Sequence, residues 1–228
     1  MIATFPMVGQ GLTAPSAAPA IIGATQSGGA SSSAWAAWPD DIQPGDLIVS
    51  FVGARGAANN MVMHSDVGFL TQLHGPDFKQ TDDGYIASWI FYRFCDGSED
   101  GGTSYSGDGV SRIGISYILI RGADPAAPFG TIATASGDDP DERVPVTVNV
   151  GADGSLVLVF SVGWDNWSNS VADVVTGLDT VITTGEDAMG IYSATPPAGS
   201  YTSPAIPQDT SDNPQNLQTA FVIYSTAP

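Results

Sequence analysis

Apolar residues along much of the chain recur with a period of two, which is the spacing of β-strands. Val144, Val146, Val148 and Val150 alternate with polar residues, so this segment has one apolar and one polar face. Glycine and proline, with 27 and 16 residues, interrupt the chain too often for long helices. The pattern predicts one helical turn, over residues 31–38, and strands over residues 47–52, 85–94, 113–120, 144–150, 156–162, 189–194 and 217–225.

Two of these strands are apolar on both faces. They are residues 47–52, Leu-Ile-Val-Ser-Phe-Val, and residues 156–160, Leu-Val-Leu-Val-Phe. A strand of a β-sandwich normally turns one face to water. We therefore expect either a loop or another subunit to cover the second face.

Short motifs recur along the chain at a constant spacing. Residues 24–28 resemble residues 133–137, which lie 109 positions later, and residues 45–51 resemble residues 154–160 at the same spacing. Chance similarity between β-rich segments is the alternative explanation. We favour two related halves, about 21–129 and 130–228, and expect the first strand of each half to follow the Ala-Thr-x-Ser-Gly motif.

These features predict an all-β chain. A half with three or four strands has too little core to fold alone, so we expect one domain over residues 1–228. The expected fold is an antiparallel β-sandwich of jelly-roll type with about eight strands, built from the two pseudo-repeated halves.

The charge balance restricts the function classes. The chain has 24 acidic and 6 basic residues and a net charge of −18, which excludes nucleic-acid binding through phosphate contacts and disfavours anionic membranes. We expect no signal peptide, because the N-terminal residues include no basic segment followed by a long apolar one, and the sequence has no apolar run of roughly 20 residues that would cross a membrane. Synthesis in a host cytoplasm is the expectation. Cys95 is the single cysteine, and we expect it to be a buried, inert thiol.

Catalytic motifs are absent from the sequence. Neither a phosphate-binding Gly-Lys-Ser/Thr loop nor a Gly-x-Ser-x-Gly nucleophile motif occurs, and we predict that the protein is not an enzyme. His64 with Asp66 and His74 with Asp77 form a loose set that we place in one loop. Their spacing matches no established metal site, so two solvated histidines are favoured over a transition-metal site.

A calcium loop is the other metal-site candidate. Asp96, Ser98 and Asp100 are spaced as at the start of an oxygen-ligand calcium loop, but the glutamate expected at its twelfth position is replaced by Gly107. Because aspartate, serine and glycine also form turns, a solvated hairpin connection is the favoured interpretation. We therefore expect no cofactor, with calcium as the weaker alternative.

One polar cluster has the residue types that bind sugars. Tryptophan faces stack on sugar rings, and neighbouring carboxylates and amides accept hydrogen bonds from hydroxyl groups. The interpretation that we favour over sugar binding is that the two tryptophans of this cluster close the end of the sandwich. The residues of this candidate glycan site are Trp164, Asp165, Asn166 and Trp167, with Asn59 and Asn60 near the corresponding position in the first half.

Several strand segments resemble a group of β-sandwich virion proteins of tailed bacteriophages. The resemblance rests on residues 44–49, 92–94, 118–124, 154–157 and 221–224. It implies a structural component of a phage or phage-like particle, such as a tail-fibre, tail-tip or capsid-decoration module. No catalytic residues carry over from this group.

The expected function follows from the resemblance and the charge. The protein is expected to be a non-enzymatic structural protein in a virion that assembles with other virion proteins and with copies of itself, as a trimer or another ring. A carbohydrate-binding module that recognises a host surface glycan is the alternative. A glycan-degrading enzyme with an aspartate or glutamate pair is the third hypothesis.

Overall fold

The computed structural model describes residues 18–29, 31–65, 70–81, 83–138, 142–163, 174–184, 189–207 and 215–225. All regular structure in these ranges is β-strand, and every strand pair is antiparallel. The predicted all-β antiparallel sandwich is thus confirmed. The described ranges contain seventeen strands, so the expected number of about eight was too low.

The first half of the chain forms a five-stranded sheet and a smaller sheet that covers it. The large sheet has the order β1-β8-β3-β6-β5, and the small sheet has the order β2-β7-β4. The strands are β1 (Ala20–Gly29), β2 (Ser33–Ala37), β3 (Leu47–Gly56), β4 (Val62–Ser65), β5 (Thr71–Thr81), β6 (Gly84–Phe94), β7 (Gly102–Asp108) and β8 (Val110–Arg121).

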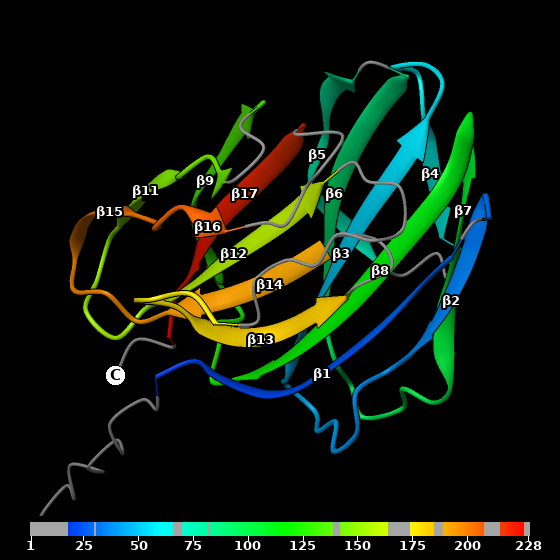
Figure 1. Cartoon of the computed structure of the whole chain (residues 1–228). Coiled ribbons are helices and arrows are strands. Elements are labelled where there is room, and N and C mark those ends of the chain that lie inside the picture. The colour runs from blue at the N-terminus through cyan, green and yellow to red at the C-terminus, as the bar shows by residue number, and fades with distance from the viewer. Residues whose placement is uncertain are drawn as a thin grey trace, which may run out of the picture.

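The second half forms another five-stranded sheet, in the order β13-β14-β12-β17-β9, and two two-stranded sheets, β11-β15 and β10-β16. Its strands are β9 (Phe129–Gly137), β10 (Glu142–Arg143), β11 (Thr147–Val150), β12 (Leu156–Gly163), β13 (Asp179–Thr184), β14 (Met189–Ala194), β15 (Gly199–Thr202), β16 (Ile206–Pro207) and β17 (Asn216–Ile223). Figure 1 shows the small sheets of the two halves at opposite sides of the molecule, with the large sheets between them.

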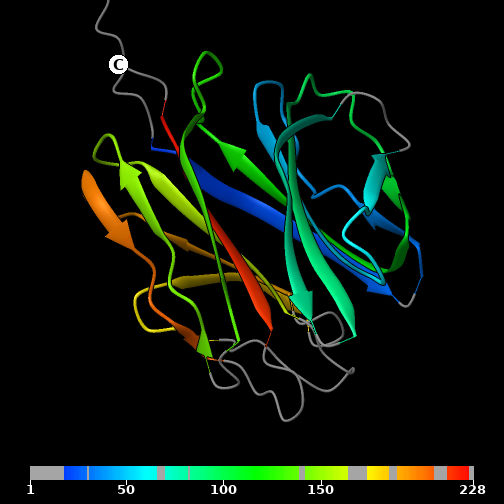
Figure 2. The same ribbon diagram turned by 90° about the horizontal axis from the view of Figure 1, so that it is seen from above.

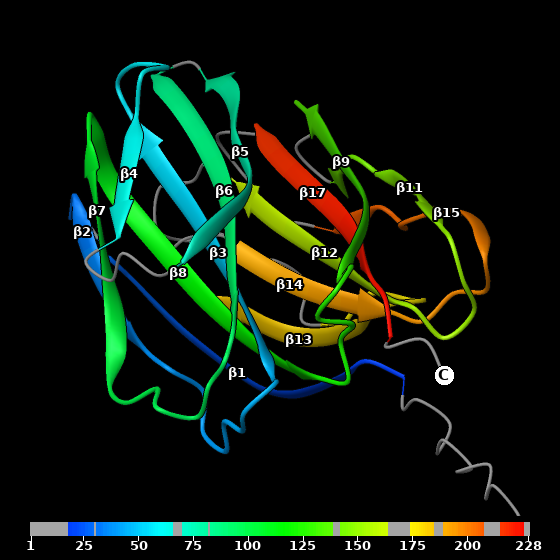
Figure 3. The ribbon, with the colours of Figure 1, turned by 180° about the vertical axis from the view of Figure 1, so that it is seen from behind.

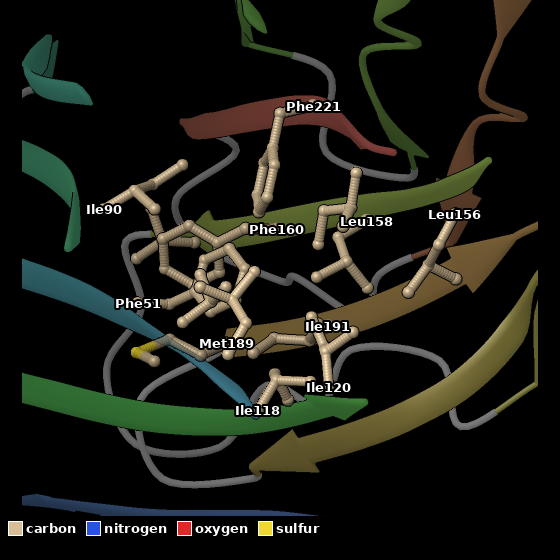
Figure 4. Close-up of a cluster of buried hydrophobic side chains, with 14 of the residues drawn as sticks. Phe51, Ile90, Ile118, Ile120, Leu156, Leu158, Phe160, Met189, Ile191 and Phe221 are labelled. Atoms are coloured by element: carbon tan, nitrogen blue, oxygen red, sulfur yellow. The ribbon is translucent and has the colours of Figure 1, made fainter. Parts of the chain in front are cut away.

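The sheets are stacked in layers around three apolar cores (Figure 2). The central core lies between the two five-stranded sheets, and it includes Phe51 from the first half and Phe160 and Phe221 from the second (Figure 4). A second core fills the space between the first large sheet and β2-β7-β4. The third core lies between the second large sheet and the strands β11 and β16.

This layering explains the two strands that are apolar on both faces. Leu47, Val49 and Phe51 of β3 point into the central core, whereas Ile48 and Val52 point into the core under the small sheet. Strand β12 is divided in the same way between the central and third cores. The expectation that a loop or another subunit covers these faces was therefore wrong, because sheets of the same chain cover them (Figure 3).

The two large sheets have the same strand order when each half is read from its first strand. In both halves the first strand pairs with the last strand, which in turn pairs with the strand that follows the Pro-Gly-Asp or Ala-Asp-Gly turn. That strand is β3 in the first half and β12 in the second. Residues 109 positions apart meet in the central core: the ring centroids of Phe51 and Phe160 are 4.9 Å apart. A Cβ built on Gly53 would stand 2.9 Å from Cγ2 of Val162, so glycine allows the sheets to approach closely there.

Some local expectations differ from the structure. Residues 31–38 do not form a helical turn, because Ser33–Ala37 pair with β7 as strand β2. The Ala-Thr-x-Ser-Gly motifs lie inside β1 and β9 rather than before the first strands. Of the strand expected over residues 144–150, β11 covers Thr147–Val150, with valines buried and polar residues exposed as predicted.

Candidate functional site

A polar cluster joins the two large sheets at one edge of the stack. His74 and Asp77 come from β5, and Thr134 and Thr219 come from β9 and β17. The Thr134 hydroxyl donates to Oδ2 of Asp77 at 2.7 Å and lies 3.1 Å from Nε2 of His74 and 3.2 Å from Oγ1 of Thr219. At the opposite edge, the Gln26 amide on β1 donates to the Thr183 carbonyl on β13 at 2.8 Å. Both edges of the stack are thus tied by polar contacts.

An irregularity in β5 brings the histidine and the aspartate together. His74 pairs with Ile90 and Asp77 with Ser88, so three steps along β5 match two along β6. Residues 74 and 77 therefore face the same side, which a regular strand would not allow. Gly75 has a φ of 91° here, and a Cβ on it would stand 3.0 Å from Cα of Trp89. The sequence-based placement of His64, His74 and Asp77 in one loop was wrong, since His64 lies in β4 and the others in β5.

The geometry of this cluster is that of a structural tie. Nε2 of His74 lies 2.7 Å from Oδ2 of Asp77, and the Thr134 hydroxyl contacts the same nitrogen. In a nucleophile–histidine–aspartate triad the two partners contact different ring nitrogens, so that a proton can pass between them. Burial alone would raise the pKa of Asp77, but the hydrogen bonds from His74 and Thr134 lower it below its usual value.

The lowered pKa of Asp77 makes the stability of the contact between the two large sheets depend on pH. Because the charged carboxylate is favoured in the folded state, its contribution is present above the unfolded pKa and is lost as the pH falls through the lower folded pKa. We expect Asp77→Asn to lower the free energy of unfolding by about 1 kcal/mol at pH 7 and by less in acid. Urea unfolding at both pH values measures the difference. The control is Asp83→Asn at an exposed turn, and equal pH dependence of Asp77→Asn and the wild type would contradict the prediction.

The predicted calcium residues lie in the connection between β6 and β7, as expected. The Ser98 backbone N–H and hydroxyl both donate to Oδ1 of Asp96, at 2.9 and 2.5 Å. Glu99 accepts the backbone N–H groups of residues 96 and 97, and its Oε1 lies 2.6 Å from a guanidinium nitrogen of Arg93. These contacts explain the compact turn without a metal ion. Asp100, the third predicted ligand, is exposed.

The other histidine has a partner that the sequence did not indicate. Nε2 of His64 lies 3.3 Å from Oδ2 of Asp108, on the neighbouring strand β7, and both side chains are exposed. Asp66, the partner suggested by the sequence, lies outside the described residues. Within the described ranges, no three histidine, cysteine, aspartate or glutamate residues gather as a metal site would require.

The structure describes only two residues of the candidate glycan site. Asn59 and Asn60 are exposed in the turn between β3 and β4, and Oδ1 of Asn60 would lie 3.6 Å from a Cβ built on Gly109. Trp164, Asp165, Asn166 and Trp167 lie outside the described residues. The described residues therefore do not test whether the two sets meet.

An exposed tryptophan that the sequence analysis missed lies on β2. Trp35 is 53% exposed, although large aromatic side chains are mostly buried. Its indole occupies the space above Gly102, because a Cβ built there would stand 2.6 Å from Cζ2 and 2.8 Å from Cε2. The alternation of Ser33, Trp35 and Ala37 with two alanines was the available signal. It is weak because alanine is common on both sides of a strand.

Cys95 is buried directly after β6. Burial and the nearby negative charge of Glu99 raise the pKa of its thiol to about 12. The thiol therefore stays protonated at neutral pH, as expected for an inert cysteine.

No protein-family model, curated protein or solved structure matches this chain. Among the residues that the structure describes, no helix has the length and apolar character needed to span a bilayer. The strand order and pairing define the class of this protein, which is an all-β protein of stacked antiparallel sheets.

Proposed function

We propose that the protein is a non-enzymatic structural component of a tailed-phage or phage-like particle, exposed as a tail-fibre, tail-tip or capsid-decoration module. The resemblance of its strand segments to phage virion proteins motivates the proposal. The observation that carries it is the stack of sheets with three filled apolar cores. Such a body is a rigid block, and its strong negative charge suits the exterior of a particle.

The described polar clusters support the non-enzymatic part of the proposal, because each of them joins segments of the fold. His74 and Asp77 bind the two large sheets together through Thr134. Arg121 holds Asp46 through two hydrogen bonds, and Arg93 holds Glu99 in the β6–β7 connection.

The proposal includes the origin of the fold from two related jelly-roll halves. The matching strand order of the two large sheets supports it. So does the contact between Phe51 and Phe160, because equivalent residues meet at the centre of a twofold interface.

Assembly into a trimer or another ring, and contacts with other virion proteins, belong to the same proposal. Since the apolar faces of β3 and β12 are covered within the chain, these contacts must use other surfaces. The strands β2 and β4 lie at the two edges of the small sheet, and an edge strand is a common place for another chain to add, so we expect these contacts there.

The test is the location and native mass of the chain. We expect particles from the organism that encodes it to contain the chain in a fixed copy number, measured by quantitative mass spectrometry and located by immunogold labelling. A cytoplasmic host enzyme, which should be absent, is the control. Light scattering should give a multiple of 23.4 kDa. A chain of 23.4 kDa that is absent from particles would contradict the proposal.

The non-enzymatic part has a separate test. Incubation of the protein with host surface polysaccharide should release no new reducing ends. Sustained release would favour the glycan-degrading alternative.

A further inference from the structure

The outer face of the small sheet β2-β7-β4 combines one exposed aromatic ring with several polar groups. Trp35 and Ser33 point outward from β2, because Ala34 and Ala36 point into the core beneath the sheet. On β7, Tyr105 and Thr103 are buried, so Gly102, Ser104 and Ser106 lie on the outer side. His64 and Val62 are the exposed residues of β4.

The central strand β7 determines the shape of this face. Small residues occupy the outer side of β7, while Trp35 lies on one side of it and His64 on the other. Trp35 pairs with Ser104 and His64 pairs with Ser106, so the two side chains lie one outward-facing position apart along β7. With strands about 4.8 Å apart, β2 and β4 stand about 10 Å from each other. A flat molecule can therefore rest on the indole and reach β4.

The polar groups at the far side can both donate and accept hydrogen bonds. His64 lies 3.3 Å from the carboxylate of Asp108, whose side chain is 85% exposed. The hydroxyl of Ser106 is next to His64 across the strand pair. An indole face beside a hydroxyl, an imidazole and a carboxylate suits a ligand with one apolar surface and several hydroxyl groups, and a sugar ring has that chemistry.

The charge of the face indicates which sugars fit. The strands β2, β4 and β7 contain no lysine or arginine, and Asp108 adds a negative charge. With a net charge of −18 on the chain, an acidic saccharide would be repelled.

We infer that the outer face of β2-β7-β4 binds a neutral saccharide, with one ring stacked on Trp35 and its hydroxyl groups bonded to Ser106, His64 and Asp108. The site differs from the one that the sequence suggested around Trp164. It goes beyond the structural role in a particle and does not depend on it, because the isolated protein suffices for binding.

Calorimetric titration of the full chain with neutral hexasaccharides built on glucose, mannose and galactose tests this inference. We expect at least one to bind, and Trp35→Ala to weaken binding at least about tenfold. Trp35→Phe should restore part of the affinity because it keeps an aromatic face, and His64→Ala should weaken binding less. The matched control is Val174→Ala, which truncates another exposed apolar side chain and should change nothing. A hexuronate is the acidic probe and should not bind.

Four results would overturn the inference. The first is that none of the neutral probes binds, and the second is that the hexuronate binds equally well. The third is that a Trp164→Ala, Trp167→Ala double variant loses binding while Trp35→Ala does not. The fourth is a smaller native mass of Trp35→Ala, which would make this face a contact between copies of the chain. Absence from particles would contradict the structural role alone, so the two proposals fail separately.

Discussion

Replacing Phe51 with alanine is expected to lower the free energy of unfolding by about 3–5 kcal/mol, a large share of the stability of an ordinary domain. Phe51 is fully buried at the centre of the core between the large sheets, where its ring centroid lies 4.9 Å from that of Phe160 and 5.6 Å from that of Phe221. Truncation removes these contacts and leaves a cavity that β-sheets on both sides cannot easily close. Denaturant unfolding followed by tryptophan fluorescence measures the loss.

The same variant tests whether the two halves unfold together. Because the central core draws side chains from both, we expect a single transition that Phe51→Ala and Phe160→Ala each shift by a similar amount. Their effects should not add, since both side chains line one contact. Val174→Ala, at an exposed position, is the control. Two separate transitions, with Phe51→Ala shifting only one, would show that the halves are independent domains.

Removing the Asp46 carboxylate is expected to have the next largest effect, about 2–4 kcal/mol. Its side chain is 3% exposed, and Oδ1 and Oδ2 each accept a hydrogen bond of 2.8 Å from Arg121, with the Gln43 backbone N–H as a third donor. Asp46→Ala removes the acceptor of these three hydrogen bonds at the start of β3, while Arg121 keeps its hydrogen bond to the Asp41 carbonyl. The cost is below that of a fully buried pair because Arg121 reaches solvent.

The effect of Asp46→Ala should depend on pH. Burial would raise the pKa of Asp46, but the hydrogen bonds from Arg121 and Gln43 hold it below its usual value. The contribution is therefore complete above the unfolded pKa and is lost as the pH falls through the folded one. Unfolding of Asp46→Ala and wild type at neutral and acidic pH measures this, with Asp83→Ala as the exposed control. A difference between the two proteins that is the same at both pH values would contradict the prediction.

The strongest strands could be predicted because their residues carry the pattern locally. The segments Leu47–Gly56, Gly84–Phe94 and Leu156–Gly163 are rich in β-branched, aromatic and other apolar residues, which favour a buried strand. Most edge and outer strands could not be predicted in this way, although the alternating valines indicated β11 (Thr147–Val150). Ser33–Ala37 consists of serine, alanine and one tryptophan, and it becomes a strand because it pairs with β7.

The same distinction applies to the candidate sites. The turn around Asp96 could be predicted, since aspartate, serine and glycine determine turns through contacts within a few residues. The pairing of His64 with Asp108 and the contact of His74 with Thr134 join residues from distant parts of the chain. Trp35 belongs to this second group, because its place above Gly102 depends on the pairing of two strands.

The sequence by itself determined that this protein is built from antiparallel β-strands and carries a strong negative charge, since periodicity and composition are properties of the chain. Only the tertiary structure decided how strands β3 and β12, which are apolar on both faces, are covered. Their second faces lie under sheets formed by other parts of the same chain, because covering them removes apolar surface from water at both faces at once. It likewise decided which polar groups meet, because the register of each strand pair sets which side chains face each other.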